Sequence, residues 1–192
     1  MRGSAKVLTA AELRRLLAHA RRSSMPTRNT TIIMLSFRAG LRACEIAGLD
    51  WPSVLRPDGR LNATIAISGN IAKNGKARSL PIHPDLRRCL QKLHTESDKP
   101  LDGPVIRSQR GDHMTPRSIV NWFALVYADL GLEGCSSHSG RRTFITQAAR
   151  LMTKVGGSLR DVQELAGHSA LSTTERYIEG DREAQRKLIR ML

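Results

Sequence analysis

Arg42 stands where a helix is expected to begin, and an acidic side chain lies one helical turn beyond it. Gly40 and Leu41 precede the arginine, and Glu45 follows three residues later on the same predicted helix face. A guanidinium that a carboxylate holds from behind is oriented to bind a phosphate through two N–H groups. The alternative is an ordinary surface ion pair, which residues at this spacing often form.

A second basic pair, His138 and Arg141, lies one turn apart at the start of another predicted helix. The free backbone N–H groups of a helix start favour an anion, so both side chains suit a phosphate site. The pattern H-x-x-R is common by chance, and alone it is weak evidence of function.

His168 and Tyr177 form a third candidate pair near the end of the sequence. His168 follows Gly167, where a helix is expected to end, and Tyr177 comes nine residues later. Ser172 and Glu175 have the spacing of a helix cap, so we expect Tyr177 to lie on a newly started helix. A tyrosine beside an isoleucine usually packs against the core, so this pair also proves nothing by itself.

The net charge of the chain indicates a polyanionic partner. Lys and Arg number 31 against 17 Asp and Glu, which gives a formal charge of +14 and a pI near 10.9. Such an excess on a small domain most often accompanies nucleic-acid binding, although a merely basic soluble protein is the alternative. The arginines are spread along the sequence, which favours a folded basic surface over a disordered basic arm.

Composition argues against several other classes of protein. The 192 residues contain no run of 18 apolar residues, so no segment is expected to span a membrane. Aromatic residues make up only 4%, too few for a platform that stacks single-stranded bases. Cys44, Cys89 and Cys135 form no C-x-x-C motif, so we expect neither disulfides nor a cysteine zinc site. We expect a cytoplasmic protein with no metal and no cofactor.

The periodicity of apolar residues predicts an α+β fold, mostly helical, with a small antiparallel sheet near residues 51–82. Alternating residues at 62–68 and 78–82 suggest a hairpin with Asn74 and Gly75 near its tip. Tyr127 falls on the apolar stripe of its helix and is assigned to packing. Helices are expected over residues 9–20, 27–36, 41–49, 84–94, 115–130, 138–152, 158–165, 172–177 and 181–192.

Five short motifs that occur in a particular order are stronger evidence of function than any of these signals alone. G-L-R-x-x-E spans 40–45, a hairpin lysine stands at Lys73, L-P-I spans 80–82, H-x-x-R spans 138–141, and L-x-G-H-x-x-x-x-T-T-x-x-Y spans 165–177. In this order they resemble the catalytic domain of the tyrosine recombinase (phage integrase) family. The resemblance runs from about Leu8 to the end of the chain.

The resemblance implies both the fold of that catalytic domain and its chemistry. Tyr177 would attack a DNA phosphodiester and form a 3′-phosphotyrosine, Arg42 and Arg141 would hold the non-bridging oxygens, and Lys73 would protonate the departing 5′ oxygen. His138 would act as base or orienting group, and His168 would donate to a non-bridging oxygen. Glu45 would support the site from behind. Neither metal nor ATP is implied, because the covalent link conserves the bond energy.

The sequence departs from the family pattern in a few places. Gly140 stands where leucine is usual, Arg142 stands where histidine is frequent, and Lys76 is an alternative to Lys73. The family also has an N-terminal helical domain that clamps the DNA, which this chain is expected to lack. Residues 1–192 are therefore expected to be one catalytic domain, either excised or naturally short.

The expected partner is double-stranded DNA, on which the chain would assemble into a tetramer from free monomers. The helix predicted at 181–192 supports exchange of strands between subunits, because the family docks such a segment onto a neighbour. A topoisomerase or resolvase-like enzyme would share the chemistry without exchanging partners. A non-catalytic DNA-binding module would bind DNA and form no covalent adduct. A bacterial, phage or mobile-element origin is expected.

Overall fold

The computed structural model describes residues 5–73, 75–177 and 189–190. Apart from its residues 189–190, the helix predicted at 181–192 lies outside the described residues. None of the described helices is long and apolar enough to cross a membrane.

The described elements confirm the predicted α+β fold. Eight α-helices and one two-stranded antiparallel sheet make up the regular structure of the described residues, with short 3₁₀ turns at Trp51–Ser53 and Thr153–Val155. The helices and strands are α1 (Ala10–Arg21), α2 (Pro26–Arg38), α3 (Ala43–Ala47), β1 (Thr64–Ile67), β2 (Arg78–Pro81), α4 (Pro84–Glu96), α5 (Pro116–Asp129), α6 (Ser139–Met152), α7 (Leu159–Ala166) and α8 (Leu171–Glu175).

Two helix starts follow the local sequence. Thr9 and Glu12 exchange hydrogen bonds as a capping box before α1, with the Thr9 N–H donating to the carboxylate at 2.8 Å. Ser158 and Asp161 form the same motif before α7. Each box satisfies backbone donors that the first helical turn leaves free, which explains why these helices begin where the sequence predicts.

The predicted start of the last described helix is wrong. Helix α8 begins at Leu171 with Ala170 as its cap, and it ends before Tyr177, which lies in the following turn. Ser172 therefore lies inside the helix and does not cap it. The physical reason is tertiary: Thr174 is fully buried and bonded to His168, and this contact sets the position of α8 instead of the local cap signal.

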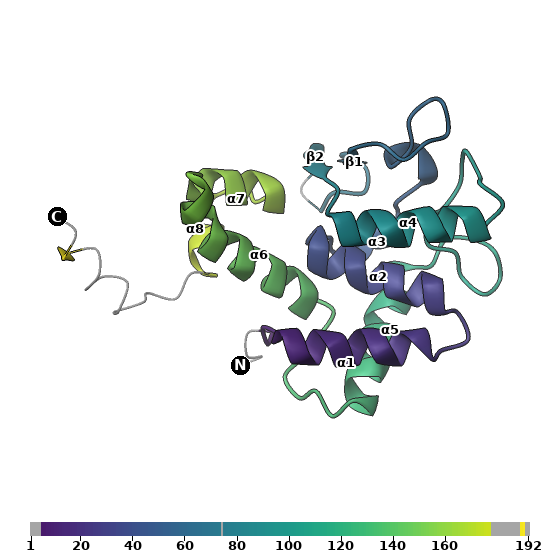
Figure 1. Cartoon of the computed structure of the whole chain (residues 1–192), viewed down its shortest axis with the longest axis horizontal. Helices are drawn as coiled ribbons and strands as arrows, with labels where there is room; N and C mark the ends of the chain where they lie inside the picture. Colours follow the sequence, from purple (N-terminus) through teal and green to yellow (C-terminus); the bar gives the residue numbers. More distant parts are fainter. Residues whose placement is uncertain (1–4, 74, 178–188, 191–192) are drawn as a thin grey trace.

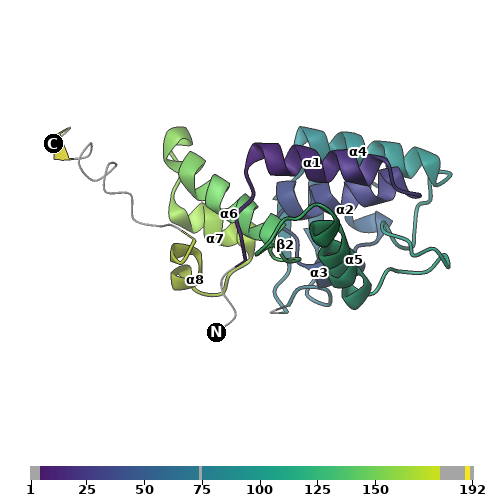
Figure 2. The ribbon, with the colours of Figure 1, turned by 90° about the horizontal axis from the view of Figure 1, so that it is seen from below.

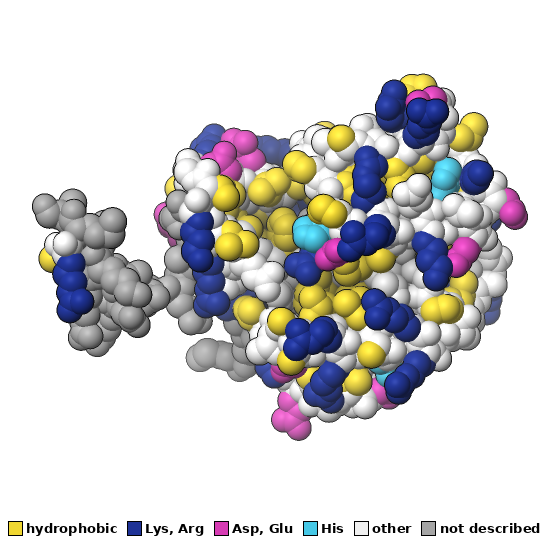
Figure 3. Space-filling view, in the orientation of Figure 1, with side chains coloured by type: hydrophobic (Ala, Val, Ile, Leu, Met, Phe, Trp, Pro, Cys, Tyr) yellow, Lys and Arg dark blue, Asp and Glu magenta, His cyan; other side chains and the backbone are white. Residues whose placement is uncertain are grey.

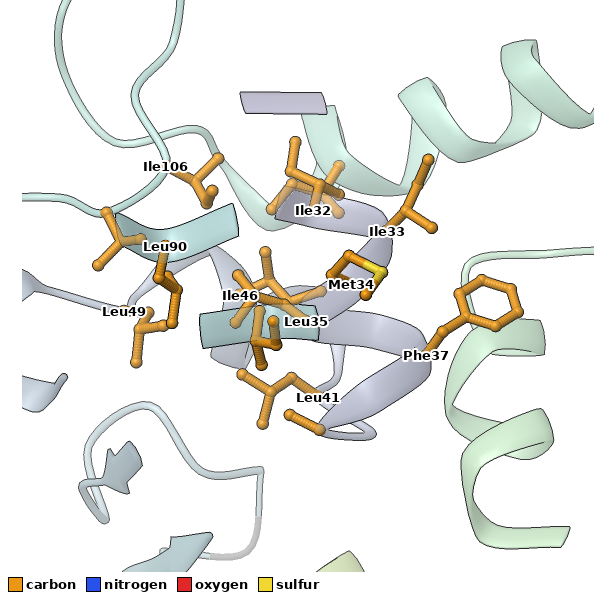
Figure 4. Close-up of a cluster of buried hydrophobic side chains, with 14 of the residues drawn as sticks. Ile32, Ile33, Met34, Leu35, Phe37, Leu41, Ile46, Leu49, Leu90 and Ile106 are labelled. Carbon is orange, nitrogen blue, oxygen red and sulfur yellow. The ribbon is translucent and has the colours of Figure 1, made fainter. Parts of the chain in front are cut away.

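Helix α2 is the centre of the main core, and nine of its 13 residues are buried. Figure 2 shows α1 and α4 on one side of α2, and α3 and α5 on the other. The apolar side chains of α2 meet those of the surrounding elements (Figure 4). The drawn and labelled members of this core are Ile32, Ile33, Met34, Leu35, Phe37, Leu41, Ile46, Leu49, Leu90 and Ile106. Burial of this kind stabilises the fold by about 25 cal/mol per Å² of apolar surface.

The hairpin lies beside this core at the top of Figure 1. Ile65 pairs with Leu80 and Ile67 pairs with Arg78, and the three apolar members of these pairs are buried. Because side chains alternate along a strand, Arg78 lies on the same inward face as Leu80.

Helices α6, α7 and α8 form a second group with its own small apolar cluster around Ile145 and Val162. The start of α6 lies directly against the end of α2 at Gly140, where an added Cβ would come within 2.8 Å of the Phe37 ring and closer still to Ser36. Figure 4 shows Phe37 pointing toward α6. Glycine at this position therefore permits the close approach of the two helices, and a leucine would force them apart.

Candidate active site

Arg42 and Glu45 are brought together by a turn and a helix start. Gly40 takes a positive φ of 63° after α2, and the chain turns so that Arg42 caps α3. The backbone N–H of Arg42 donates to Glu45 Oε2 at 2.9 Å, and its Nη1 donates to Oε1 at 3.0 Å. Figure 1 shows α3 next to the end of α2. The predicted Arg–Glu pair is therefore present, with the carboxylate behind the guanidinium.

Glu45 is fully buried and stays ionised because it accepts four hydrogen bonds, two from Arg42 and two from Arg78. Burial by itself would raise the pKa of the carboxyl group, but the Arg78 side chain, the Arg42 N–H and the two guanidinium charges hold the pKa below its ordinary value. Arg78 makes a two-pronged contact, with Nη1 at 2.8 Å from Oε1 and Nη2 at 2.9 Å from Oε2.

Sequence reasoning missed the role of Arg78, although a signal was present. The two-residue alternation that places Leu80 inward also places Arg78 inward. A charged residue on the inward face of a strand needs a buried partner, and Glu45 is that partner.

Arg141 joins the ends of two helices. Its Nη1 donates to the carbonyl of Gly40 at 2.6 Å, and its Nη2 donates to the carbonyl of Ala166 at 2.5 Å. The residue is 3% exposed, and burial followed by repulsion from Arg42 lowers its pKa to about 10. Arg141 therefore remains a cation at neutral pH and is fixed in place before any ligand arrives.

His138 lies at an exposed position just before α6, within the field of these cations. Partial desolvation of the imidazole lowers its pKa first, and the charges of Lys73, Arg141 and Arg42 lower it further. The imidazole is therefore neutral at pH 7, as a proton acceptor must be. The charge of Lys73 acts on His138, whereas Lys76 lines a cavity of about 640 Å³ between β2 and α7. This arrangement favours Lys73 over Lys76 as the hairpin lysine of the site.

His168 follows the C-terminal cap of α7, where Gly167 has a positive φ of 62°. Its Nδ1 lies 2.9 Å from the Thr174 hydroxyl, and the residue is 9% exposed. Burial, and then the charges of Arg141 and Arg42, lower the pKa of His168 to about 4. The Thr174 contact was not foreseen; the paired threonines of the 165–177 motif are the signal that could have found it.

The ring of Tyr177 lies against the side chains of His168 and Arg142. It stacks on His168 with 5.7 Å between centroids, and Arg142 Cζ lies 5.5 Å from the same ring centre.

The other tyrosine has a purely structural environment. Tyr127 is 2% exposed and stacks on Phe123 at 5.7 Å, and burial raises its pKa. Its assignment to packing is confirmed.

The structure thus brings the residues of all five motifs to one place with a surplus of positive charge. The buried carboxylate of Glu45 faces the guanidiniums of Arg42 and Arg78, and Arg141 lies close by. The two histidines add no charge at neutral pH, since the pKa of each is lowered. This site suits a phosphate group, and Figure 3 shows further Lys and Arg side chains distributed over the molecular surface.

Residues 6–183 match the sequence pattern of the phage integrase family. The chain belongs to this family. Among relatives, it is 31% identical over 159 residues to the tyrosine recombinase XerC of Bradyrhizobium diazoefficiens, covering 81% of this chain and 47% of that protein. It is 29% identical over 179 residues to XerC of Brucella suis, covering 90% and 54%. The chain spans about half the length of the curated relatives it matches.

Solved structures of integrases and recombinases share the fold. The Tn1549 transposon integrase, in complex with transposon right end DNA, superposes with a TM-score of 0.78 at 18% identity, over 99% of this chain and 67% of that one. XerA recombinase superposes with a TM-score of 0.74 at 21% identity, over 98% and 65%. The predicted family and fold are therefore confirmed for this phage integrase family member.

Proposed function

We propose that this chain is the catalytic domain of a site-specific recombinase that cleaves and rejoins double-stranded DNA through a 3′-phosphotyrosine on Tyr177. The observation that carries the proposal is the position of Tyr177. Its ring rests on His168 and Arg142, and Arg142 directly follows the buried Arg141 on α6. A nucleophile beside fixed cations is the arrangement that phosphoryl transfer requires.

Arg42 and Arg141 bind the two non-bridging oxygens of the scissile phosphate. Both are oriented before DNA binds, Arg42 by Glu45 and Arg141 by two backbone carbonyls. Fixed donors of this kind stabilise a transition state by about 3 kcal/mol each, because no reorganisation is needed as charge develops.

Proton transfer is divided between the two sides of the phosphate. Neutral His138 accepts the proton of the Tyr177 hydroxyl as the phenolic oxygen bonds to phosphorus. Lys73 gives a proton to the 5′ oxygen as the P–O bond breaks. His168 donates from Nε2 to a non-bridging oxygen, while its Nδ1 accepts the hydrogen of Thr174.

The reaction exchanges one phosphodiester for another and therefore needs no energy source. The 5′ hydroxyl of a second strand attacks the phosphotyrosine, Tyr177 leaves, and the DNA is resealed. The guanidiniums and Lys73 supply the positive charge that divalent ions supply in metal-dependent nucleases. The steps therefore require neither ATP nor metal.

The proposed setting is the cytoplasm, with monomers that assemble into a tetramer on DNA. Relatives are named tyrosine recombinases, and one fold relative, a lambda integrase, was solved as a dimer bound to a core site. Exchange of strands requires several nucleophiles on paired duplexes, which supports assembly on DNA.

A pool of nicked duplexes with randomised sequence tests the proposal, because cleavage next to the nick releases a short fragment and traps the protein. Covalent adducts are isolated on denaturing gels, their DNA is sequenced, and the modified residue is mapped by mass spectrometry. We expect an enriched sequence joined through a 3′ phosphate to Tyr177. Attachment at another residue, or DNA binding without any adduct, contradicts the proposal.

The same selected site separates strand exchange from simple relaxation. Two duplexes with different fluorescent labels are incubated with the protein, and a supercoiled plasmid carrying the site is incubated in parallel. Joined products with both labels are expected for a recombinase. Relaxation of the plasmid without doubly labelled products indicates a topoisomerase instead.

A further inference from the structure

Arg78 contacts the site at two places, although none of the proposed steps uses it. Its two Nη atoms hold both oxygens of Glu45, and its side chain is 9% exposed. It also lies across Gly167, where an added Cβ would come within 2.9 Å of Arg78 Cδ and 3.0 Å of Nη1. One side chain on β2 therefore contacts both the start of α3 and the end of α7.

We propose that Arg78 is a positioning residue that fixes Glu45, and through it the guanidinium of Arg42, for binding of the scissile phosphate. This inference rests on the proposed function. The Arg42 guanidinium makes one hydrogen bond to Glu45, so its orientation depends on the orientation of the carboxylate. A carboxylate held by the planar fork of Arg78 cannot rotate, and the donors of Arg42 that remain free are thereby aimed.

Direct contact of Arg78 with DNA does not explain its burial. Both of its Nη atoms are engaged by Glu45, and Nε is buried without a hydrogen-bond partner among the described residues. The residue therefore acts through Glu45 and is not a catalytic residue.

Stability alone is also a poor explanation for the Arg78–Glu45 pair. Removing two charges from water costs several kcal/mol per ion, and apolar side chains of similar volume often give equal or greater stability. The ion pair has one benefit that apolar residues lack: it fixes the orientation of the Arg42 guanidinium, which bonds to Glu45.

The position of Arg78 also links the hairpin to the rest of the site. Lys73 lies five residues before it in the same hairpin, and His168 directly follows the Gly167 backbone on which Arg78 lies. A displaced hairpin would pull on Glu45 and on the end of α7 together. Arg78 therefore couples the placement of the general acid to that of the phosphate-binding groups.

A substitution cycle on the single-turnover rate of adduct formation tests this inference. Arg78→Lys keeps the charge but removes the fork, Glu45→Gln removes the carboxylate, and the third variant carries both. Arg87→Lys is the matched control, because Arg87 is another partly buried arginine whose guanidinium donates to protein oxygens, here the carbonyls of Leu61 and Asn62. DNA affinity and thermal unfolding are measured for every variant.

We expect Arg78→Lys to slow adduct formation on the order of 10- to 100-fold, the size found for outer partners that orient metal ligands. DNA affinity stays unchanged, and Arg87→Lys remains within about twofold of wild type. The double variant forms the adduct as fast as Glu45→Gln alone. A rate reduction in the double variant equal to the product of the two single reductions overturns the proposal, as does a wild-type rate for Arg78→Lys.

An apolar pair separates positioning from stability. Glu45→Leu with Arg78→Met removes both charges together, so the protein is expected to fold. Recovery of the wild-type rate in this variant would show that the pair serves folding alone. We expect normal unfolding and a rate at least as low as that of Glu45→Gln.

A DNA-free measurement keeps the inference separate from the proposed function. Inorganic phosphate is titrated into the protein while the Nε–H resonance of Arg42 is followed by NMR. We expect several-fold weaker phosphate binding in Arg78→Lys than in wild type or Arg87→Lys. If wild type forms no adduct, the proposed function fails, and this titration alone decides the role of Arg78. Equal phosphate affinity in all three proteins contradicts the positioning role.

Discussion

The guanidinium of Arg142 lies over the ring of Tyr177, with 5.5 Å from Cζ to the ring centroid. His168 stacks on the same ring at an interplanar angle of 23°. The proposed nucleophile is therefore held by side chains from α6 and from the end of α7. Arg142 stands where the family often has histidine, so this chain uses a permanent cation at that place.

Substitution of Arg142 is expected to loosen Tyr177 without unfolding the protein. Cation–π contacts contribute about 0.5–2 kcal/mol, so Arg142→Leu should slow adduct formation by about 2- to 30-fold. Arg142→Lys should lie between this variant and wild type. Arg150→Leu, at an exposed position of the same helix, is the control and should leave the rate unchanged. A wild-type rate for Arg142→Leu would show that the contact has no role in the reaction.

Tyr177→Phe removes only the hydroxyl and is expected to abolish the covalent adduct. Folding and DNA binding should be nearly unchanged, because the ring keeps its contacts with His168 and Arg142. Tyr127→Phe is the matched control, since the chain contains only these two tyrosines. Denaturing gels of the trapped substrate measure the outcome. An adduct in Tyr177→Phe contradicts the assignment of the nucleophile.

Lys73→Ala is expected to slow cleavage of normal DNA and to have much less effect when sulfur replaces the bridging 5′ oxygen. A thiolate leaves without a proton, so the missing acid no longer limits the rate. Single-turnover rates on both substrates test this expectation. The same measurements on Lys76→Ala serve as the comparison. If Lys73→Ala lowers the cleavage rate equally on both substrates, Lys73 is not the general acid.

Thermal stability is expected to fall as the pH drops from about 6.5 towards 4. The pKa of His168 is lowered to about 4 in the folded protein, so the unfolded chain takes up the proton first as the solution is acidified. This contribution to stability is complete above the ordinary pKa of 6.5 and is lost as the pH approaches 4. Unfolding midpoints at pH 7 and pH 5 measure the slope. His168→Asn should lower the midpoint at pH 7 and flatten the slope, and an unchanged slope would contradict the burial of a neutral histidine.

Chelation of metal ions is expected to leave the cleavage rate nearly unchanged. The positive charge at the proposed phosphate site comes from protein side chains, so rates in excess EDTA and in Mg²⁺ should agree within a few-fold. The wild-type adduct assay, run in both buffers, provides the measurement. Complete loss in EDTA that Mg²⁺ restores would indicate a metal-dependent nuclease.

Much of the fold and most of the candidate site could be predicted from the sequence, because local signals coincide with the tertiary arrangement. The capping boxes at Thr9 and Ser158 begin their helices where expected. The start of α8 was misplaced because a buried contact to His168 outweighed a local signal. Arg78 was missed because its function depends on Glu45, which lies 33 residues away and meets it only in the folded protein.

The contacts of Arg141 have a consequence for the life of the newly made protein. Its guanidinium reaches one carbonyl 101 residues earlier in the chain and another 25 residues later, so the proposed phosphate site forms only when distant segments have met. Synthesis also delivers Tyr177 after the other members of the site. A partly synthesised or misfolded chain would therefore bear scattered basic residues but no assembled phosphate site. The proposed strand cleavage is thus expected only from chains that have finished folding.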